Sequence, residues 1–209
     1  MTANSPIRIL TVDDHPMLRE GIAAVLANET DMVLVAEASN GSEAVEKFRS
    51  HRPDVTLMDL KMPYLNGSDA IQAIRSEFPE ARIIVLTTYS GDAQADRAFK
   101  AGAWGYLLKS MLRKELVETI RTVHSGRKKI APEIATELAE HHADDALTER
   151  EIDVLQQVAS GNANKIVADH LTISEETVKA HMRKILSKLG ANDRTHAVAI
   201  ALKRGIIEI

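Results

Sequence analysis

Five short apolar runs alternate with helical patterns over residues 1–125 of the chain. Strands that are buried on both faces give such continuous apolar runs, whereas the intervening segments repeat apolar residues at helical spacing. Alternating strands and helices favour a parallel sheet with helices on both faces. The sequence therefore predicts an α/β domain with a five-stranded parallel sheet, whose strands lie within residues 7–12, 33–36, 55–58, 82–87 and 102–109.

Polar side chains follow four of these runs, at the point where each predicted strand ends. Asp13 and Asp14 follow the first run, Asp59 the third, Thr87 the fourth and Lys109 the fifth. In open α/β sheets the carboxyl ends of the strands share one edge, and ligands bind there. Each residue alone is explained equally well as the start of a turn. Their occurrence together predicts one polar site at that edge.

The charges of this predicted site narrow its chemistry. Two carboxylates about 4 Å apart repel each other by roughly 4 kcal/mol at an effective dielectric constant of about 20. Asp13, Asp14 and Asp59 therefore share an edge only if a cation or raised pKa values relieve the repulsion. Mg²⁺ prefers such hard oxygen ligands, and Lys109 adds a fixed positive charge. An acidic cluster beside an ammonium group and the Thr87 hydroxyl is suited to a phosphoryl group on a carboxylate nucleophile.

Composition excludes several other classes of protein. The chain has no cysteine, so disulfides, thiolate metal sites and cysteine nucleophiles are excluded. The sequence has no signal-peptide pattern and no membrane-spanning run, so we expect a cytoplasmic protein without a membrane partner. The net charge of −4 does not indicate nucleic-acid binding by the chain as a whole. The acidic excess lies in residues 1–146, however, and residues 147–209 are slightly basic, so any basic surface is local.

A polar segment separates the first domain from the rest of the chain. It begins with a basic run, and Ile134 and Leu138 then indicate a short amphipathic helix. The adjacent His141 and His142 resemble a pair of metal ligands, but neighbouring residues on a helix point in different directions, which favours a solvated hinge. We therefore divide the chain into a first domain of residues 1–125, a linker of residues 126–146 and a second domain of residues 147–209.

The second domain shows the start signals of helices. Thr148 is a candidate N-cap, and Glu151 stands three residues later, as in a capping box. Ser174 is a candidate cap for a third helix, and Glu175 and Glu176 in its first turn are favourable near the positive end of the helix dipole. The apolar spacing predicts an all-α domain of four helices.

The third of these helices has two distinct faces. Lys179 and Arg183 are i,i+4 partners, and Ala180 lies beside them. Two cationic side chains around a small one allow a helix to approach a DNA groove closely. The helix alone is explained as well by a solvated basic face, but its place after a short helix and a tight turn favours a recognition helix. Its predicted buried face consists of Val178, Met182, Ile185 and Leu189.

The motifs of the first domain resemble the receiver domain of bacterial two-component response regulators. The resemblance covers residues 7–124 and implies a flavodoxin-like sheet with strand order 2-1-3-4-5. The motifs that carry it are Asp13-Asp14-His15-Pro16, Met58-Asp59-Leu60-Lys61-Met62-Pro63 with Gly67, Thr87, and Gly105-Tyr106-Leu107-Leu108-Lys109. One position departs from the family, because Ser110 stands where many receivers have a proline after the lysine. The geometry of the Lys109–Ser110 bond is therefore an open question at this point.

This resemblance implies a role for each residue of the predicted site. Asp59 is then the acceptor of a phosphoryl group from a sensor histidine kinase. Asp14 and Asp59, with the carbonyl of Lys61, would hold Mg²⁺, and Asp13 would support the metal through water. The resemblance further implies that Thr87 and Lys109 contact the phosphoryl oxygens. It also implies that Tyr106 switches between two side-chain positions.

The second domain resembles the helix-turn-helix domain of the LuxR/FixJ-type regulators, also called the NarL/FixJ family. The matching motifs are Leu147-Thr148-Glu149-Arg150-Glu151, Asn164-Lys165, Ile173-Ser174-Glu175-Glu176-Thr177-Val178-Lys179-Ala180-His181, Lys188-Leu189-Gly190 and Arg194-Thr195. The resemblance implies that Lys179, Ala180 and Arg183 face the major groove of promoter DNA, while Lys165 and Thr177 contact phosphates.

Further expectations follow from the same resemblance. The last helix would pair with a second copy of itself, so the active form would be a homodimer. His181 is expected to be packed or bonded to the backbone, and Ile166 replaces a glutamate that is usual in the family. RNA polymerase is a further candidate partner.

Together these patterns favour a phosphorylation-dependent, DNA-binding transcriptional regulator rather than an enzyme. The enzyme alternative is a haloacid-dehalogenase-like phosphatase, which also combines an aspartate nucleophile with Mg²⁺, threonine and lysine. That chemistry needs its nucleophile after the first strand and a second aspartate two residues later, whereas Lys61 stands there. A protein-interaction module is the other alternative, and it does not account for Lys179 and Arg183.

Overall fold

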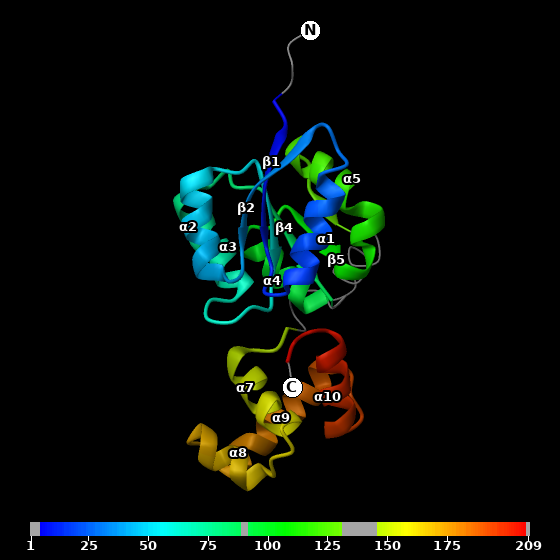
Figure 1. The fold of residues 1–209 in the computed structure, drawn as a ribbon. Coiled ribbons are helices and arrows are strands. Elements are labelled where there is room, and N and C mark those ends of the chain that lie inside the picture. The colour runs from blue at the N-terminus through cyan, green and yellow to red at the C-terminus, as the bar shows by residue number, and fades with distance from the viewer. Residues whose placement is uncertain (1–4, 89–91, 131–145, 208–209) are drawn as a thin grey trace. The chain divides into compact units, whose positions relative to one another are not determined.

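A parallel sheet of six strands, in the order β2-β1-β3-β4-β5-β6, forms the centre of the first part of the chain (Figure 1). The computed structural model describes residues 5–88, 92–130 and 146–207, which belong to two separate units. The short helix expected around Ile134 and Leu138, and the His141-His142 pair, lie outside the described residues. The strands are β1 (Ile7–Val12), β2 (Met32–Ala38), β3 (Val55–Asp59), β4 (Ile83–Thr87), β5 (Gly105–Leu108) and β6 (Lys129–Ile130).

The order of the first five strands confirms the prediction, and β6 is an addition to it. Lys129 and Ile130 pair in parallel with Gly105 and Tyr106 of β5, within the segment predicted as the linker. A strand of two residues is too short to show an apolar run or an alternation, so the sequence pattern does not reveal it.

Helices cover both faces of the sheet, with α1 and α5 on one face and α2 and α3 on the other (Figure 1). Leu57 and Met58 are neighbours on β3 and are both fully buried, as a strand covered on both faces requires. Asn40 and Asn66 cap α2 and α3 by accepting hydrogen bonds from backbone amides in their first turns. The helices are α1 (Pro16–Leu26), α2 (Gly41–His51), α3 (Gly67–Glu77), α4 (Asp92–Lys100) and α5 (Leu112–His124).

The strand register brings the predicted polar residues to the same edge of the sheet. Asp59, the last residue of β3, lies opposite Leu86 of β4, and Thr87 at the end of β4 lies opposite Leu108 of β5. Lys109 follows Leu108 directly and starts a short 3-10 turn before α5. The carboxyl ends of these strands therefore form one rim.

Residues 146–207 of the second unit form four helices, as predicted: α7 (Glu149–Ala159), α8 (Asn164–Leu171), α9 (Glu175–Leu189) and α10 (Arg194–Lys203). Thr148 and Glu151 form the expected capping box, and Ser174 accepts a hydrogen bond from the amide of Thr177. Of the apolar face predicted for α9, Met182 is only half-buried. The other three residues, Val178, Ile185 and Leu189, are buried in the helical core.

One ion pair ties the start of α7 to the end of α9. Glu151 is buried, and its carboxylate lies 2.8 Å from the Nζ atom of Lys188. Burial works to raise the pKa of Glu151, but the hydrogen bonds from Lys188 and the Thr148 amide outweigh it, so the pKa is lowered. The described helices include none that is long and apolar enough to span a membrane.

Candidate functional site

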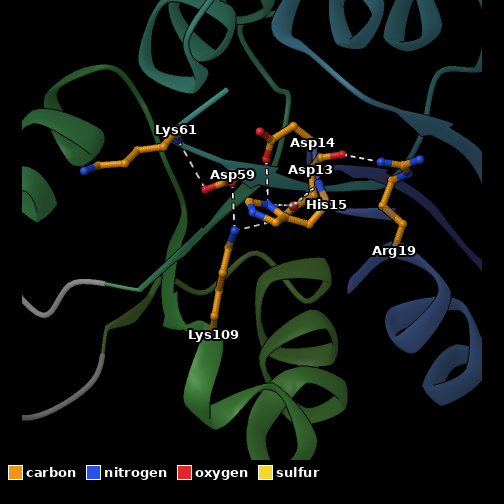
Figure 2. A network of polar contacts seen from close by, with 7 residues as sticks. All are labelled: Asp13, Asp14, His15, Arg19, Asp59, Lys61 and Lys109. Carbon is orange, nitrogen blue, oxygen red and sulfur yellow. Dashed lines mark hydrogen bonds and ion pairs between the residues drawn. The ribbon is translucent and has the colours of Figure 1, made fainter. Parts of the chain in front are cut away.

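Four side chains gather at the carboxyl ends of β1 and β3, as Figure 2 shows. Asp13, Asp14, His15 and Asp59 each place one potential ligand atom within 4.8 Å of all the others. Asp13 and Asp59 are buried, Asp14 is partly buried and His15 is exposed. The three carboxylates predicted to share an edge therefore do so, and His15 joins them.

Lys109 holds two of these carboxylates together. Its Nζ atom lies 2.7 Å from an oxygen of Asp13 and 2.7 Å from an oxygen of Asp59 (Figure 2). Burial works to lower the pKa of Lys109, but hydrogen bonds and charge interactions with both aspartates raise it overall. The ammonium group is therefore held in its charged form between the two acids.

The pKa of Asp59 is raised, in the direction expected for a buried acid. Burial is the largest cause, because it disfavours the charged carboxylate, and the negative charge of Asp13 adds to it. The hydrogen bond and charge of Lys109 oppose this shift without cancelling it. Three carboxylates meet a single lysine ammonium at this site, which favours binding of a further cation.

The oxygen donors of this cluster fit a small, hard divalent cation. Carboxylate oxygens are the ligands that Mg²⁺ prefers, and Mg²⁺ uses only one or two of them while retaining waters. Asp14 is the most accessible of the three acids, with 32% of its side chain exposed. The cluster therefore satisfies the donor chemistry of a metal site.

The loop that joins β1 to α1 is fixed by contacts that the motifs did not reveal. The His15 amide donates to Oδ1 of Asp13 at 2.8 Å, and Arg19 Nη1 donates to the Asp13 carbonyl at 2.6 Å. Arg19 also contacts Glu37 of β2 at 3.3 Å. His15 was visible in the sequence only as part of a motif. Arg19 gave no signal, because its partner at this edge is a backbone carbonyl.

The loop after Asp59 approaches the start of α3 very closely. The amide of Lys61 donates to Oδ1 of Asp59 at 3.3 Å, and Gly67 donates to the Leu60 carbonyl at 3.0 Å. A Cβ atom at Gly67 would overlap the Asp59 carbonyl oxygen and would lie 2.8 Å from the Leu60 Cα atom. Glycine is therefore required at this position, whereas the metal-binding role of the Lys61 carbonyl stays a prediction.

Thr87 and Tyr106 lie buried on the adjacent strands β4 and β5. Burial raises the pKa of Tyr106 to about 12, although a hydrogen bond with Thr87 works in the opposite direction. The Tyr106 ring is only 1% exposed, so it occupies an inward position next to the threonine. The Lys109–Ser110 peptide bond is trans, which answers the question raised by the serine at position 110.

The second candidate site is the exposed face of α9. Lys179 and Arg183 are exposed there, while Ala180 and Thr177 are half-buried. Lys179 Nζ lies 2.7 Å from a carboxylate oxygen of Glu176, one turn earlier on the helix. The predicted cationic face is therefore present, and it includes Glu176, which the sequence predicted as a favourable first-turn acid but not as a partner of Lys179.

Three other residues of the second unit complete this description. Lys165 is exposed at the start of α8, as a phosphate contact requires. His181 is half-buried, and its expected role as a packed or backbone-bonded residue stays a prediction. Ile166, the departure from the family pattern, is 44% exposed and does not belong to the core.

Comparison with known families agrees with both parts of this geometry. Residues 9–121 match the response regulator receiver domain, and residues 145–201 match the bacterial regulatory proteins of the LuxR family. The chain therefore belongs to the response regulators that join a receiver domain to a LuxR-type DNA-binding domain.

Two relatives match nearly the whole chain, and a solved structure matches part of it. Transcriptional regulatory protein YxjL of Bacillus subtilis is 38% identical, with 97% of this chain and 98% of YxjL covered. Protein YhcZ of the same organism is 40% identical, with 94% of this chain and 96% of YhcZ covered. The crystal structure of a LuxR-family response regulator from Aurantimonas sp. SI85-9A1 is 41% identical, with a TM-score of 0.62, and covers 65% of this chain and 97% of that one.

Proposed function

We propose that Asp59 accepts a phosphoryl group from a sensor histidine kinase and that this modification controls promoter binding by α9. The observation that carries the proposal is the Asp59 carboxylate at the rim of the sheet, 2.7 Å from Lys109 and beside two further acids. The family supports it, because the chain joins a receiver domain to a LuxR-type DNA-binding domain.

In this reaction an Asp59 oxygen forms a bond to phosphorus while the bond to the histidine nitrogen of the kinase breaks. Lys109 stabilises the charge that develops on the phosphoryl oxygens, and the Thr87 hydroxyl donates a hydrogen bond to them. Asp14, Asp59 and the Lys61 carbonyl would hold Mg²⁺, with Asp13 as support. That ion supplies positive charge that neutralises the crowded oxygens.

The DNA-binding function belongs to the exposed face of α9. Lys179, Ala180 and Arg183 would enter the major groove, and Lys165 and Thr177 would contact phosphates. Binding to two half-sites requires two recognition helices, so the active form would be a homodimer that pairs through α10. The promoter-bound dimer would then act on RNA polymerase.

Coupling between the two functions would begin at Thr87, Lys109 and Tyr106. A phosphoryl group carries about −1.5 to −2 charges if it behaves like phosphoserine, in place of the single charge of the Asp59 carboxylate, and this draws Lys109 and Thr87 towards it. The inward position of Tyr106 leaves its ring beside Thr87. Movement of Thr87 would therefore alter the packing of the Tyr106 ring and the surface of strands β4 and β5.

A labelling experiment tests the first step of this proposal. Treatment with acetyl phosphate should modify the parent protein in the presence of Mg²⁺, and chelation should prevent it. Asp59→Asn should abolish the modification. Asp54→Asn is a matched control, because Asp54 lies just before β3 and accepts a hydrogen bond from the Arg8 amide instead. Undiminished labelling of Asp59→Asn would refute the assignment.

A further inference from the structure

The exposed face of α9 carries an internal ion pair on a residue that is proposed to read DNA. Lys179 and Glu176 lie one turn apart, with 2.7 Å between the ammonium nitrogen and a carboxylate oxygen. Their hydrogen bond raises the pKa of Lys179 and lowers that of Glu176, so each group favours the charged form of the other. Glu175, the preceding residue, forms no ion pair within the described part of the chain.

This pair changes what Lys179 offers to DNA. Exposed ion pairs of this kind are weak, so Glu176 does not immobilise the lysine. It does, however, place a negative charge on the face that approaches the phosphate backbone, and it offers the ammonium group an alternative partner. Contacts to phosphates carry no sequence information, and they account for nearly all non-specific affinity. Glu176 therefore weakens the part of binding that does not discriminate between sequences.

The base pairs of the major groove supply partners for both members of the ion pair. Guanine presents two acceptors that lysine contacts, and the amino group of cytosine donates to carboxylates. Only DNA that places a guanine beside Lys179 and a cytosine amino group beside Glu176 offers each side chain a new partner in exchange for the other. Other sequences would leave the carboxylate facing phosphates without a donor.

We propose that Glu176 is a specificity-determining residue, which lowers affinity for non-specific DNA and reads a cytosine beside the guanine contacted by Lys179. The proposal rests on the proposed function of α9 as the recognition helix. It assigns to Glu176 a role that depends on Lys179, whereas the adjacent Glu175 has the same charge without that contact.

The test compares Glu176→Ala with Glu175→Ala, which removes the same charge from the same helical turn. The probes are a duplex selected by the parent protein from a random pool and a duplex of random sequence. Each phosphate contact contributes a slope of about 0.9 to the salt dependence, so removal of the Glu176 charge should strengthen non-specific binding by at most about fivefold at 0.15 M salt. We expect Glu176→Ala to show this gain in affinity for the random duplex and a smaller change in affinity for the selected duplex. A repeated selection with this variant should no longer enrich the cytosine. Glu175→Ala should keep the parental ratio of the two affinities.

A double-mutant comparison separates this inference from the function on which it rests. In a Lys179→Ala background, Glu176→Ala should change the ratio of selected to random affinity less than it does in the parent, because the contact between the two side chains is already absent. If Lys179→Ala weakens binding but Glu176→Ala behaves like Glu175→Ala, only the role of Glu176 is overturned. If Lys179→Ala leaves both affinities unchanged, the assignment of the recognition face fails, and the role of Glu176 fails with it.

Discussion

Replacing Lys188 with methionine should destabilise the second unit by leaving a buried carboxylate without its cation. Lys188 Nζ contacts Glu151 at 2.8 Å and the Ala146 carbonyl at 2.9 Å, and the Glu151 side chain is only 4% exposed. Breaking a buried pair costs roughly 3–5 kcal/mol. A quarter of the lysine side chain is exposed, so solvent screening reduces our expectation to about 2 kcal/mol. For a unit of this size that corresponds to a fall in Tm of roughly 8–16 °C.

The pH dependence of this loss has a definite sign. The pKa of Glu151 is lowered in the folded parent, so its contribution to stability is present above the unfolded value near 4.5 and is lost as pH falls through the folded value. Without Lys188 the pKa-lowering hydrogen bond and charge of the lysine are lost while burial still disfavours the charged carboxylate, so the folded pKa should rise. The difference in Tm between parent and variant should therefore shrink as the solution is acidified.

Calorimetry of the full chain measures both effects, and hydrogen exchange in α7 and α9 assigns the transition. Lys184→Met is the matched control, because Lys184 is an exposed lysine on the same helix. Combining Lys188→Met with Glu151→Gln should recover part of the loss, since the buried charge is then removed. If the double variant is as unstable as the single one, or the loss does not depend on pH, an unpaired carboxylate is not its cause.

Three further substitutions test individual parts of the structure. Gly67→Ala should destabilise the first unit by about 1–3 kcal/mol in denaturant unfolding, because the added Cβ atom would overlap the backbone. Gly21→Ala is the control and should not destabilise the unit, because nothing lies within 4 Å of a Cβ atom there. Equal stability of the two variants would contradict the close approach at Gly67. In Arg19→Met, the Mg²⁺ concentration needed for half-maximal phosphorylation should rise several-fold, because the loop that carries Asp13 loses a hydrogen bond from Arg19. An unchanged Mg²⁺ requirement would show that Arg19 does not position this loop. Ile166→Glu should change the free energy of unfolding of the second unit by no more than about 0.5 kcal/mol, because Ile166 lies outside the core. A large loss of stability would show that Ile166 packs against the core.

The sequence predicts best those structural features that depend on residues close to one another in the chain. The parallel sheet, the caps at Thr148 and Ser174 and the meeting of Asp13 with Asp59 follow from local patterns and from the common direction of parallel strands, whereas the strand order followed from the family resemblance. Each of these signals lies within a few residues, or at the end of a strand, so it can be recognised without the tertiary structure.

Other features depend on contacts between distant residues and could not be predicted in this way. Glu151 shows a capping-box pattern, but its pairing with Lys188 requires the packing of α7 against α9. The contact of Arg19 with the Asp13 carbonyl leaves no pattern in side-chain spacing. The inward position of Tyr106 depends on how its ring packs in the folded protein, so only the structure assigns it.

The central claim is that phosphorylation of Asp59 controls DNA binding by α9, and one titration tests it directly. The affinity for a duplex selected by the protein should be measured with and without beryllofluoride and Mg²⁺, for the parent and for Asp59→Asn. We expect beryllofluoride to tighten binding by the parent and to leave Asp59→Asn unchanged. Equal affinity of the parent in both conditions would contradict the account and would leave a receiver domain and a DNA-binding domain without functional coupling.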